Sequence, residues 1–131
     1  MKVLRTSGTV DDKRIIDAVE AATGIQNIRL TTRKREYVDA RRIAYKIFRV
    51  TKMYSYSKIG SLFDKDHATI LFGIKTAENL LDTEPSFKHN YLEALSVIGG
   101  LEGRKARIME RINQLKKELL TIEKKENGIQ L

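Results

Sequence analysis

Apolar residues recur at intervals of three and four along most of this 131-residue chain. This spacing places apolar side chains on one face of a helix, whereas strictly alternating runs, which would indicate strands, are scarce. A single proline, Pro85, interrupts the pattern. The sequence therefore predicts an all-α protein, and its length suits one domain with some chain to spare.

Capping residues predict where the first helices begin and end. Thr9-Val10-Asp11-Asp12 is a capping-box pattern and Gly24 suits a left-handed C-cap, so we expect a first helix between them. Its buried residues should be Ile15, Ile16, Val19 and Ala22. A basic connector over residues 25–35 then leads to a second helix over Glu36–Thr51, whose apolar stripe leaves Arg41, Arg42, Lys46 and Arg49 on other faces.

Two shorter helices follow. Ser55 is suited to cap a brief helix that carries Ile59, Leu62 and Phe63, and Asp66 to cap a further helix that runs to about Leu81. Asp64-Lys65 forms the turn between them. Two helices joined by so tight a turn indicate a helix-turn-helix.

Pro85 suits the first position of the next helix, which should be lined by Phe87, Tyr91, Leu92, Leu95 and Ile98. Gly99-Gly100 then interrupts the helical pattern. We expect a tail over residues 1–8, a domain over 9–98 and a separate helix over 101–127.

The last helix carries a heptad repeat. Leu101, Ile108, Leu115, Ile122 and Ile129 recur every seven residues, and Ile112 and Leu119 occupy the second seam position. A short coiled coil is therefore expected. Parallel pairing would oppose Arg111 to Lys116 and Glu118 to Glu123, whereas antiparallel pairing opposes Arg111 to Glu118 and Lys116 to Glu123, so the charges favour the antiparallel form. The seam is short enough that packing back on the chain's own domain is an equal alternative.

Composition excludes several classes of protein. The chain has no cysteine and two histidines, which argues against disulfide scaffolds, cysteine nucleophiles and metal sites. It has no run of 18 apolar residues and no signal peptide, so we expect a soluble cytoplasmic protein with no membrane partner. A formal net charge of +8 points instead to a polyanion as partner.

The positive charge is concentrated in one segment. Residues 29–58 contain ten basic residues and only two acidic ones, Glu36 and Asp39. The net charge of this segment is therefore +8, equal to the net charge of the whole chain. The ten basic residues are Arg29, Arg33, Lys34, Arg35, Arg41, Arg42, Lys46, Arg49, Lys52 and Lys58. Such a patch beside a helix-turn-helix favours binding to duplex DNA over a merely solvated face.

The predicted recognition helix opens with Asp66-His67-Ala68-Thr69. The first turn of such a helix reaches into the major groove, where Ala68 and Thr69 can offer a methyl to thymine and His67 can bond a purine edge or a phosphate. Asp66 can accept from cytosine N4 if it is not occupied as the N-cap. In the alternative interpretation, Asp66 only caps the helix and His67 is ordinary surface.

The segment from Arg33 to Leu81 resembles the C-terminal DNA-binding domain (domain IV) of the bacterial replication initiator DnaA. The resemblance rests on Arg33 in the basic loop, Ala40-Arg41-Arg42-Ile43-Ala44, Ser57-Lys58-Ile59-Gly60-Ser61-Leu62-Phe63 and Asp66-His67-Ala68-Thr69-Ile70. The last of these is similar to the family's Asp-His-Thr-Thr-Val, its most specific signature. With its flanking helices, the domain would cover about two thirds of the chain.

The resemblance implies a Trp-repressor-like helix-turn-helix whose Asp66-to-Thr69 turn reads a DnaA box, while Arg33 enters the adjacent minor groove. Phosphates would be held by Arg41, Arg42, Arg49, Lys58 and Lys65. The chain departs from the family pattern at Ala68, where many members have Thr, at Arg42, where Gln is usual, and in a turn before Asp66 that is one residue shorter. These departures imply a changed sequence preference.

The initiator's ATPase motif G-x-x-x-x-G-K-[ST] is absent, and so are other catalytic motifs, so we expect a stand-alone DnaA-like protein that is not an enzyme and needs no cofactor. Two functions are then open. The first is a sequence-specific DNA-binding protein, of a bacterium, phage or mobile element, that serves as replication accessory or transcriptional regulator. The second is an adaptor that uses its C-terminal helix to bind itself or a replication protein and has only non-specific DNA affinity. RNA binding is disfavoured, because no RNP-like aromatic pair or GXXG loop is present.

Overall fold

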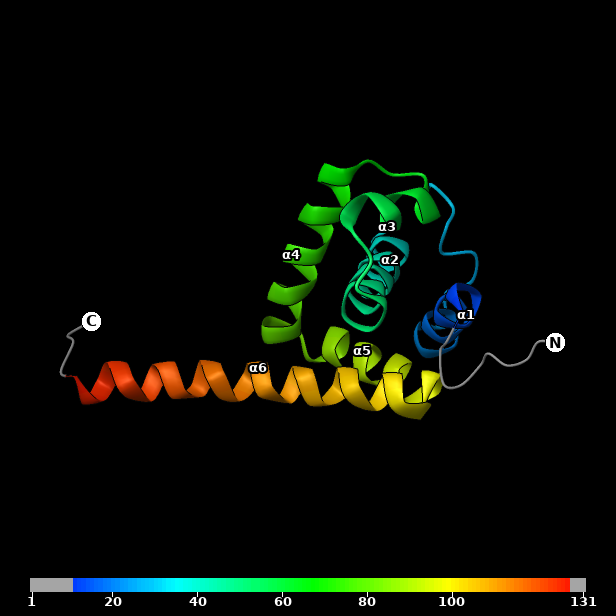
Figure 1. Cartoon of the computed structure of the whole chain (residues 1–131). Coiled ribbons are helices and arrows are strands. Elements are labelled where there is room, and N and C mark those ends of the chain that lie inside the picture. The colour runs from blue at the N-terminus through cyan, green and yellow to red at the C-terminus, as the bar shows by residue number, and fades with distance from the viewer. Residues whose placement is uncertain (1–10, 128–131) are drawn as a thin grey trace.

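The computed structural model describes residues 11–127, and all regular structure in this range is helical, which confirms the all-α prediction. The elements are α1 (Asp12–Thr23), α2 (Arg35–Ile47), the π-helical turn η2 (Phe48–Lys52), α3 (Tyr56–Phe63), α4 (His67–Thr83), α5 (Pro85–Ile98) and α6 (Gly100–Glu126). Helices α1 to α5 form one bundle, and α6 lies along one end of it (Figure 1). No helix in this range is long and apolar enough to cross a bilayer.

Three helices begin at the capping residues that the sequence predicts, Asp11, Ser55 and Asp66. Each side chain accepts a hydrogen bond of 2.8–3.1 Å from the backbone N–H three residues further on, which satisfies a donor that the first turn leaves free. Helix α1 ends at Gly24 in the left-handed conformation, as predicted. The predicted tail and Thr9 lie outside the described residues.

The second helix differs from the prediction in its last turn. The regular α-helix ends at Ile47 and continues as the wider π-helical turn η2. Met53 then follows with a left-handed φ of 57°. Phe48, the first residue of η2, is fully buried and its ring stacks on Tyr54 at 5.9 Å between centroids. A π turn takes up one extra residue, so it changes which side chains face inward after Phe48. Helix α4 also continues two residues past the expected end, to Thr83.

The core lies among α1, α2, α4 and α5, and the aromatic rings of α2 and α3 close one side of it. Phe63 of α3 meets Tyr45 and Phe48 edge-on, with centroids 5.0 and 6.1 Å away. Of the apolar residues that the sequence analysis named for these helices, Ala22, Leu62 and Leu92 are only partly buried. The short helix α3 is thus anchored to the bundle by Phe63 together with the fully buried Ile59.

The helix-turn-helix of α3 and α4 depends on a close approach at Gly60. Lys65 donates its backbone N–H to the Gly60 carbonyl at 2.9 Å, and Asp64 between them has a left-handed φ of 56°. A Cβ on Gly60 would lie 2.3 Å from the Lys65 carbonyl oxygen. This turn sets the angle at which α4 leaves α3, so it positions the recognition turn.

Helix α6 packs on α5 through its first half and extends beyond the bundle through its second (Figure 1). The chain bends at Gly99 and Gly100, both with positive φ, as the glycine pair predicts. Gly103 then contacts α5 so closely that a Cβ would lie 2.4 Å from the Leu95 carbonyl oxygen. The first half of α6 therefore folds back on its own domain, and a coiled coil is not seen in this single chain.

Candidate nucleic-acid interface

The first turn of α4 lies at the end of the bundle remote from α6 (Figure 1). His67, Ala68 and Thr69 are all exposed there. A helix N-terminus presents free backbone N–H groups and the positive end of its dipole, both of which attract phosphate. Three small or polar side chains on an exposed first turn have the composition that a major-groove floor accepts.

Asp66 is occupied as the cap of this turn. Its carboxylate accepts the Thr69 N–H at 2.8 Å. Hydrogen bonds from the Thr69 side chain and backbone lower the pKa of the Asp66 carboxyl below its usual range. The sequence-based assignment of Asp66 to a cytosine required a carboxyl free of capping, and that condition is not met.

His67 belongs to a row of contacting side chains that also includes Tyr56 and Arg49 and so joins three elements. Its ring meets Tyr56 of α3 edge-on at 5.4 Å, and the guanidinium of Arg49 lies 4.4 Å from the centroid of the same Tyr56 ring. Arg49 also donates to the Tyr54 carbonyl at 2.8 Å. Tyr56 therefore links the basic η2 segment to the recognition turn. Tyr56 was not predicted as a site residue, because it directly follows the Ser55 cap and belongs to no recognisable motif or apolar stripe.

Arg41 does not lie where a phosphate ligand is needed, which corrects the prediction for this residue. It is only 5% exposed. Its guanidinium donates to the backbone carbonyls of Ile28, Leu30 and Thr32 at 3.1, 2.6 and 2.7 Å. Arg41 thus fastens the basic connector to α2, and it acts on Arg33 by fixing the backbone just before it. Arg33 itself is exposed.

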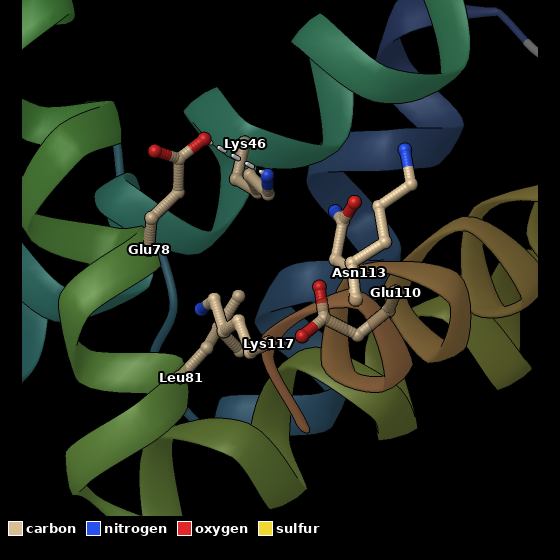
Figure 2. Close-up of a pocket in the computed structure, with 7 residues that line it drawn as sticks. Lys46, Glu78, Leu81, Glu110, Asn113 and Lys117 are labelled. Atoms are coloured by element: carbon tan, nitrogen blue, oxygen red, sulfur yellow. Dashed lines mark hydrogen bonds and ion pairs between the residues drawn. The ribbon is translucent and has the colours of Figure 1, made fainter. Parts of the chain in front are cut away.

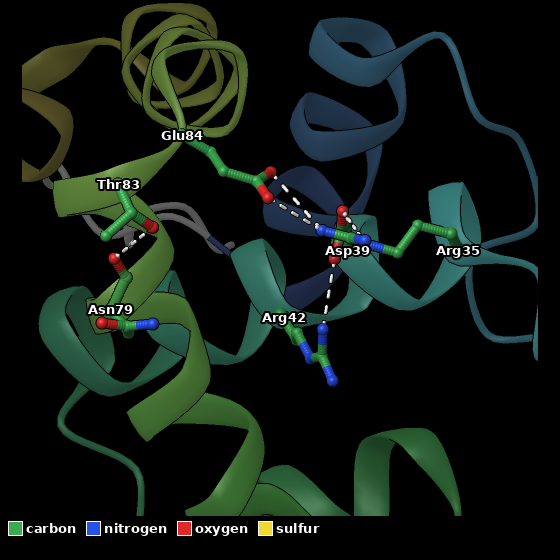
Figure 3. A network of polar contacts seen from close by, with 6 residues as sticks. All are labelled: Arg35, Asp39, Arg42, Asn79, Thr83 and Glu84. Atoms are coloured by element: carbon green, nitrogen blue, oxygen red, sulfur yellow. Dashed lines mark hydrogen bonds and ion pairs between the residues drawn. The ribbon is translucent and has the colours of Figure 1, made fainter.

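Arg42 lies between α2 and α4 and is partly exposed (Figure 3). Its guanidinium donates to Asp39 at 3.2 Å, and the other oxygen of that carboxylate accepts from Arg35 at 2.8 Å. Arg35 also reaches Glu84 at the end of α4, at 3.1 Å. The pKa of Arg35 is raised, mainly by its hydrogen bond to Asp39. This network turns Arg42 toward the groove beside α4.

The groove between α2 and α4 opens next to the recognition turn. Among the residues that line it are Arg42, Lys65, Thr69 and Phe72. Lys58 of α3 is exposed, and its ammonium lies 5.2 Å from the centre of the Tyr54 ring. Arg42 and Lys65 thus lie beside the exposed first turn of α4.

The sequence of the helix-turn-helix region is similar to that of a known family. Residues 13–76 match the bacterial DnaA protein helix-turn-helix. The helix-turn-helix of this chain is thus similar to that of the bacterial DnaA protein. The match includes α1, α2, α3 and most of α4, and it confirms the resemblance inferred from the sequence motifs. In this family the segment is the DNA-binding domain, and no catalytic domain is indicated in the matched region.

Three chromosomal replication initiator proteins DnaA are similar to part of the chain. That of Bacteroides thetaiotaomicron is 39% identical over 72 residues, 54% of this chain and 15% of the relative. That of Flavobacterium psychrophilum is 43% identical over 58 residues, which is 44% of this chain and 12% of the relative. That of Bacteroides fragilis is 35% identical over 83 residues, which is 61% of this chain and 17% of the relative. The chain thus covers less than a fifth of these relatives. No solved structure matches it significantly.

Within this DnaA-type domain, Lys46 is directed away from the recognition turn. It is buried and pairs with Glu78 of α4 at 3.1 Å, in a polar cavity between α6 and the helices α2 and α4 (Figure 2). The cavity is lined by Lys46, Glu78, Leu81, Glu110, Asn113, Lys116 and Lys117. Because Arg41 and Lys46 are both buried, fewer basic residues of the 29–58 segment are exposed than its sequence contains.

Phe72 is an exposed aromatic residue on the DnaA-type recognition helix that the sequence analysis did not single out. It is 66% exposed, one turn after Ala68 and Thr69. The buried residues of α4 here are Ile70, Gly73, Ile74 and Ala77, and Phe72 falls off that stripe. A large apolar residue off the buried face of a recognition helix is a readable signal for a contact surface.

Proposed function

We propose that this chain binds double-stranded DNA sequence-specifically, with the first turn of α4 in the major groove and Arg33 in the adjacent minor groove. The observation that carries this proposal is the exposed turn His67-Ala68-Thr69 with the partly exposed cations Arg42 and Lys65 in the groove beside it. Phosphate contacts fix the register of a protein on the duplex, and side chains on base edges supply specificity. The domain offers both kinds of group on one surface.

Base reading would be mostly apolar. Because the Thr69 N–H bonds Asp66, Thr69 meets the bases through its side chain, which carries a methyl group. Ala68 and Phe72 extend this apolar strip along α4, and such side chains favour the thymine C5-methyl. His67, fixed against Tyr56, supplies the one polar group that can donate or accept at a base edge. The cognate site should therefore contain thymines opposite α4.

Phosphates would be held by Arg42, Lys58 and Lys65, with Arg49 contributing the part of its guanidinium that Tyr54 and Tyr56 leave accessible. Arg41 leaves this set and becomes a positioning residue for Arg33. Each lysine or arginine on a phosphate releases counterions, so affinity should fall with rising salt on all sequences alike.

The target would be a site like the DnaA box, and the protein would act as a replication accessory factor or a transcriptional regulator. The changes at Ala68 and Arg42 and the short turn at Gly60 alter the surface that meets the bases. We therefore expect a preference that overlaps with the standard box without matching it at every position.

The test compares the whole chain on a DnaA-box duplex, a scrambled duplex and a pool of random duplexes across salt concentrations. Fluorescence anisotropy should show a preference of about a hundredfold, or roughly 2.7 kcal/mol, for the box or for a sequence enriched from the pool. His67→Ala should reduce that preference, and His89→Ala, on α5, should not. Equal affinity for all duplexes with no enriched sequence would contradict the proposal.

An adaptor that binds chiefly through α6 is the second candidate function, favoured by the row of exposed apolar side chains on that helix. Under this alternative, His67→Ala and Arg42→Ala would weaken binding to specific and random DNA equally. Under the first, only Arg42→Ala acts on both.

A further inference from the structure

One face of α6 carries a row of large aliphatic side chains that are exposed. They are 42–75% exposed, and we call them the apolar seam: Leu101, Ile108, Ile112, Leu115, Leu119 and Ile122. They extend over nearly the whole helix. An exposed apolar strip of this length on a soluble domain indicates a partner surface.

The opposite face of α6 is the one that holds it to the domain. Gly103, Ala106 and Glu110 are buried there, and further along the helix Lys117 pairs with Asp82 of α4 at 2.5 Å. At 3.6 residues per turn, this face and the apolar seam lie roughly 180° apart around the helix. Docking on the domain therefore leaves the apolar seam turned away from it.

We propose that the apolar seam binds the apolar seam of a second copy of this chain, with the two α6 helices antiparallel. The flanking charges select the orientation. In a parallel pair, Arg111 would face Lys116 and Glu118 would face Glu123, whereas the antiparallel pair sets Arg111 against Glu118. On the other side of the seam, the antiparallel pair sets Lys116 against Glu123. The two repulsive contacts of the parallel pair are thus replaced by two attractive ones.

The antiparallel register also matches the apolar residues. Placing Ile112 against Ile122 of the second copy brings Leu115 against its Leu119, and the two-fold symmetry repeats both contacts. The centre of this pairing lies near residue 117, where α6 leaves the bundle (Figure 1). The projecting half of each helix is then covered by the docked half of the other.

The two DNA-binding surfaces of such a dimer face away from each other. Each domain lies on the side of its own α6 opposite the apolar seam, so the helix pair separates the two domains. The first turn of α4 lies at the end of the bundle remote from α6 (Figure 1). The dimer therefore joins two separate duplex segments instead of reading two adjacent half-sites. This step rests on the proposed function, whereas the dimer itself does not.

Oligomeric state tests the dimer without any DNA. Light scattering of the full chain at micromolar concentrations should give a mass of two chains. Leu119→Lys should give one chain, and Leu120→Lys should leave the dimer intact. The two leucines are neighbours with similar exposure, 54% and 57%, but only Leu119 belongs to the apolar seam. A single-chain mass for the unaltered protein, or equal loss in both variants, would overturn the proposal.

Disulfide trapping tests the orientation, because the chain has no cysteine of its own. A mixture of Ile112→Cys and Ile122→Cys proteins should form a mixed disulfide, and neither alone should cross-link efficiently. Efficient cross-linking of each variant with itself would indicate a parallel pair and overturn the antiparallel arrangement.

Bridging is tested by capture of a labelled duplex on beads that carry a second duplex of the same sequence. The unaltered chain and Leu120→Lys should capture the labelled duplex. Leu119→Lys should lose capture about tenfold or more while its affinity for a single duplex changes less than twofold. Capture by the monomeric variant, or a dimer that binds one duplex and never two, would overturn bridging. If no variant binds DNA, the proposed function fails, and the mass measurement still decides the dimer.

Discussion

The Arg41 guanidinium donates a 2.7 Å hydrogen bond to the Thr32 carbonyl, one residue before the arginine that we propose for the minor groove. Two further carbonyls of the connector accept from the same guanidinium. A buried cation that donates to three carbonyls of one loop stabilises the conformation of that loop. The connector that carries Arg33 is therefore held in place by the fold itself.

Arg41→Ala should lower the free energy of unfolding by about 2–4 kcal/mol, because three connector carbonyls lose a charged donor and a buried side chain leaves a void. Urea denaturation followed by circular dichroism measures this loss. Arg33→Ala is the matched control, and since Arg33 is exposed, it should change stability by less than about 0.5 kcal/mol while weakening DNA binding. Equal stability of the two variants would contradict the role given to Arg41.

Gly60→Ala should disturb the turn between α3 and α4. The added Cβ would lie 2.3 Å from the Lys65 carbonyl oxygen, so backbone has to move, at a cost of about 1–3 kcal/mol. We also expect DNA affinity to fall, because α4 changes its angle. Ser61→Ala, at the exposed neighbouring position, should alter neither property appreciably. Thermal unfolding and anisotropy of both variants measure these effects, and an unchanged melting temperature in Gly60→Ala would refute the close approach.

Local signals in the sequence were sufficient to predict much of the fold. Asp11, Ser55 and Asp66 cap helices through contacts within four residues, so their pattern predicts the helix starts. The widening at Phe48 was not predictable in this way, because it depends on the ring's packing against Tyr54 and Phe63. No short-range pattern records that packing.

The site was predicted less completely. Arg41 and Arg42 are adjacent basic residues on one helix, and charge alone does not separate them. Helical spacing does, because Arg41 falls four residues after Tyr37 and seven before Phe48, on a stripe that turns inward. A charged residue on that stripe should have been read as a buried structural donor. The partners of Arg41 remain beyond prediction, since they are backbone atoms of a loop.

Phe72→Ala should reduce affinity for the enriched duplex about fivefold or more, because an exposed aromatic ring no longer covers a thymine methyl. Replacing individual thymines by uracil removes that methyl from the DNA side. One such replacement should weaken the unaltered chain and have no further effect on Phe72→Ala. Val97→Ala, an exposed apolar residue on α5, serves as control. If every uracil duplex affects both proteins equally, Phe72 does not read thymine.

Asp82 should make the anchoring of α6 sensitive to acid. Lys117 and Gln114 both donate to its carboxylate, and the hydrogen bond from Lys117 is the main reason that the pKa of Asp82 is lowered. A carboxyl with a lowered folded-state pKa contributes stability that is present above its unfolded pKa, near 4, and is lost as pH falls through the folded value. Since the pair is partly exposed, we expect about 0.2–1 kcal/mol. Asp82→Asn should therefore be less stable than the unaltered chain at pH 7, and the two should converge below about pH 3. Melting temperatures across this range measure the difference, and a gap that stays constant down to the lowest pH would exclude the ion pair as its cause.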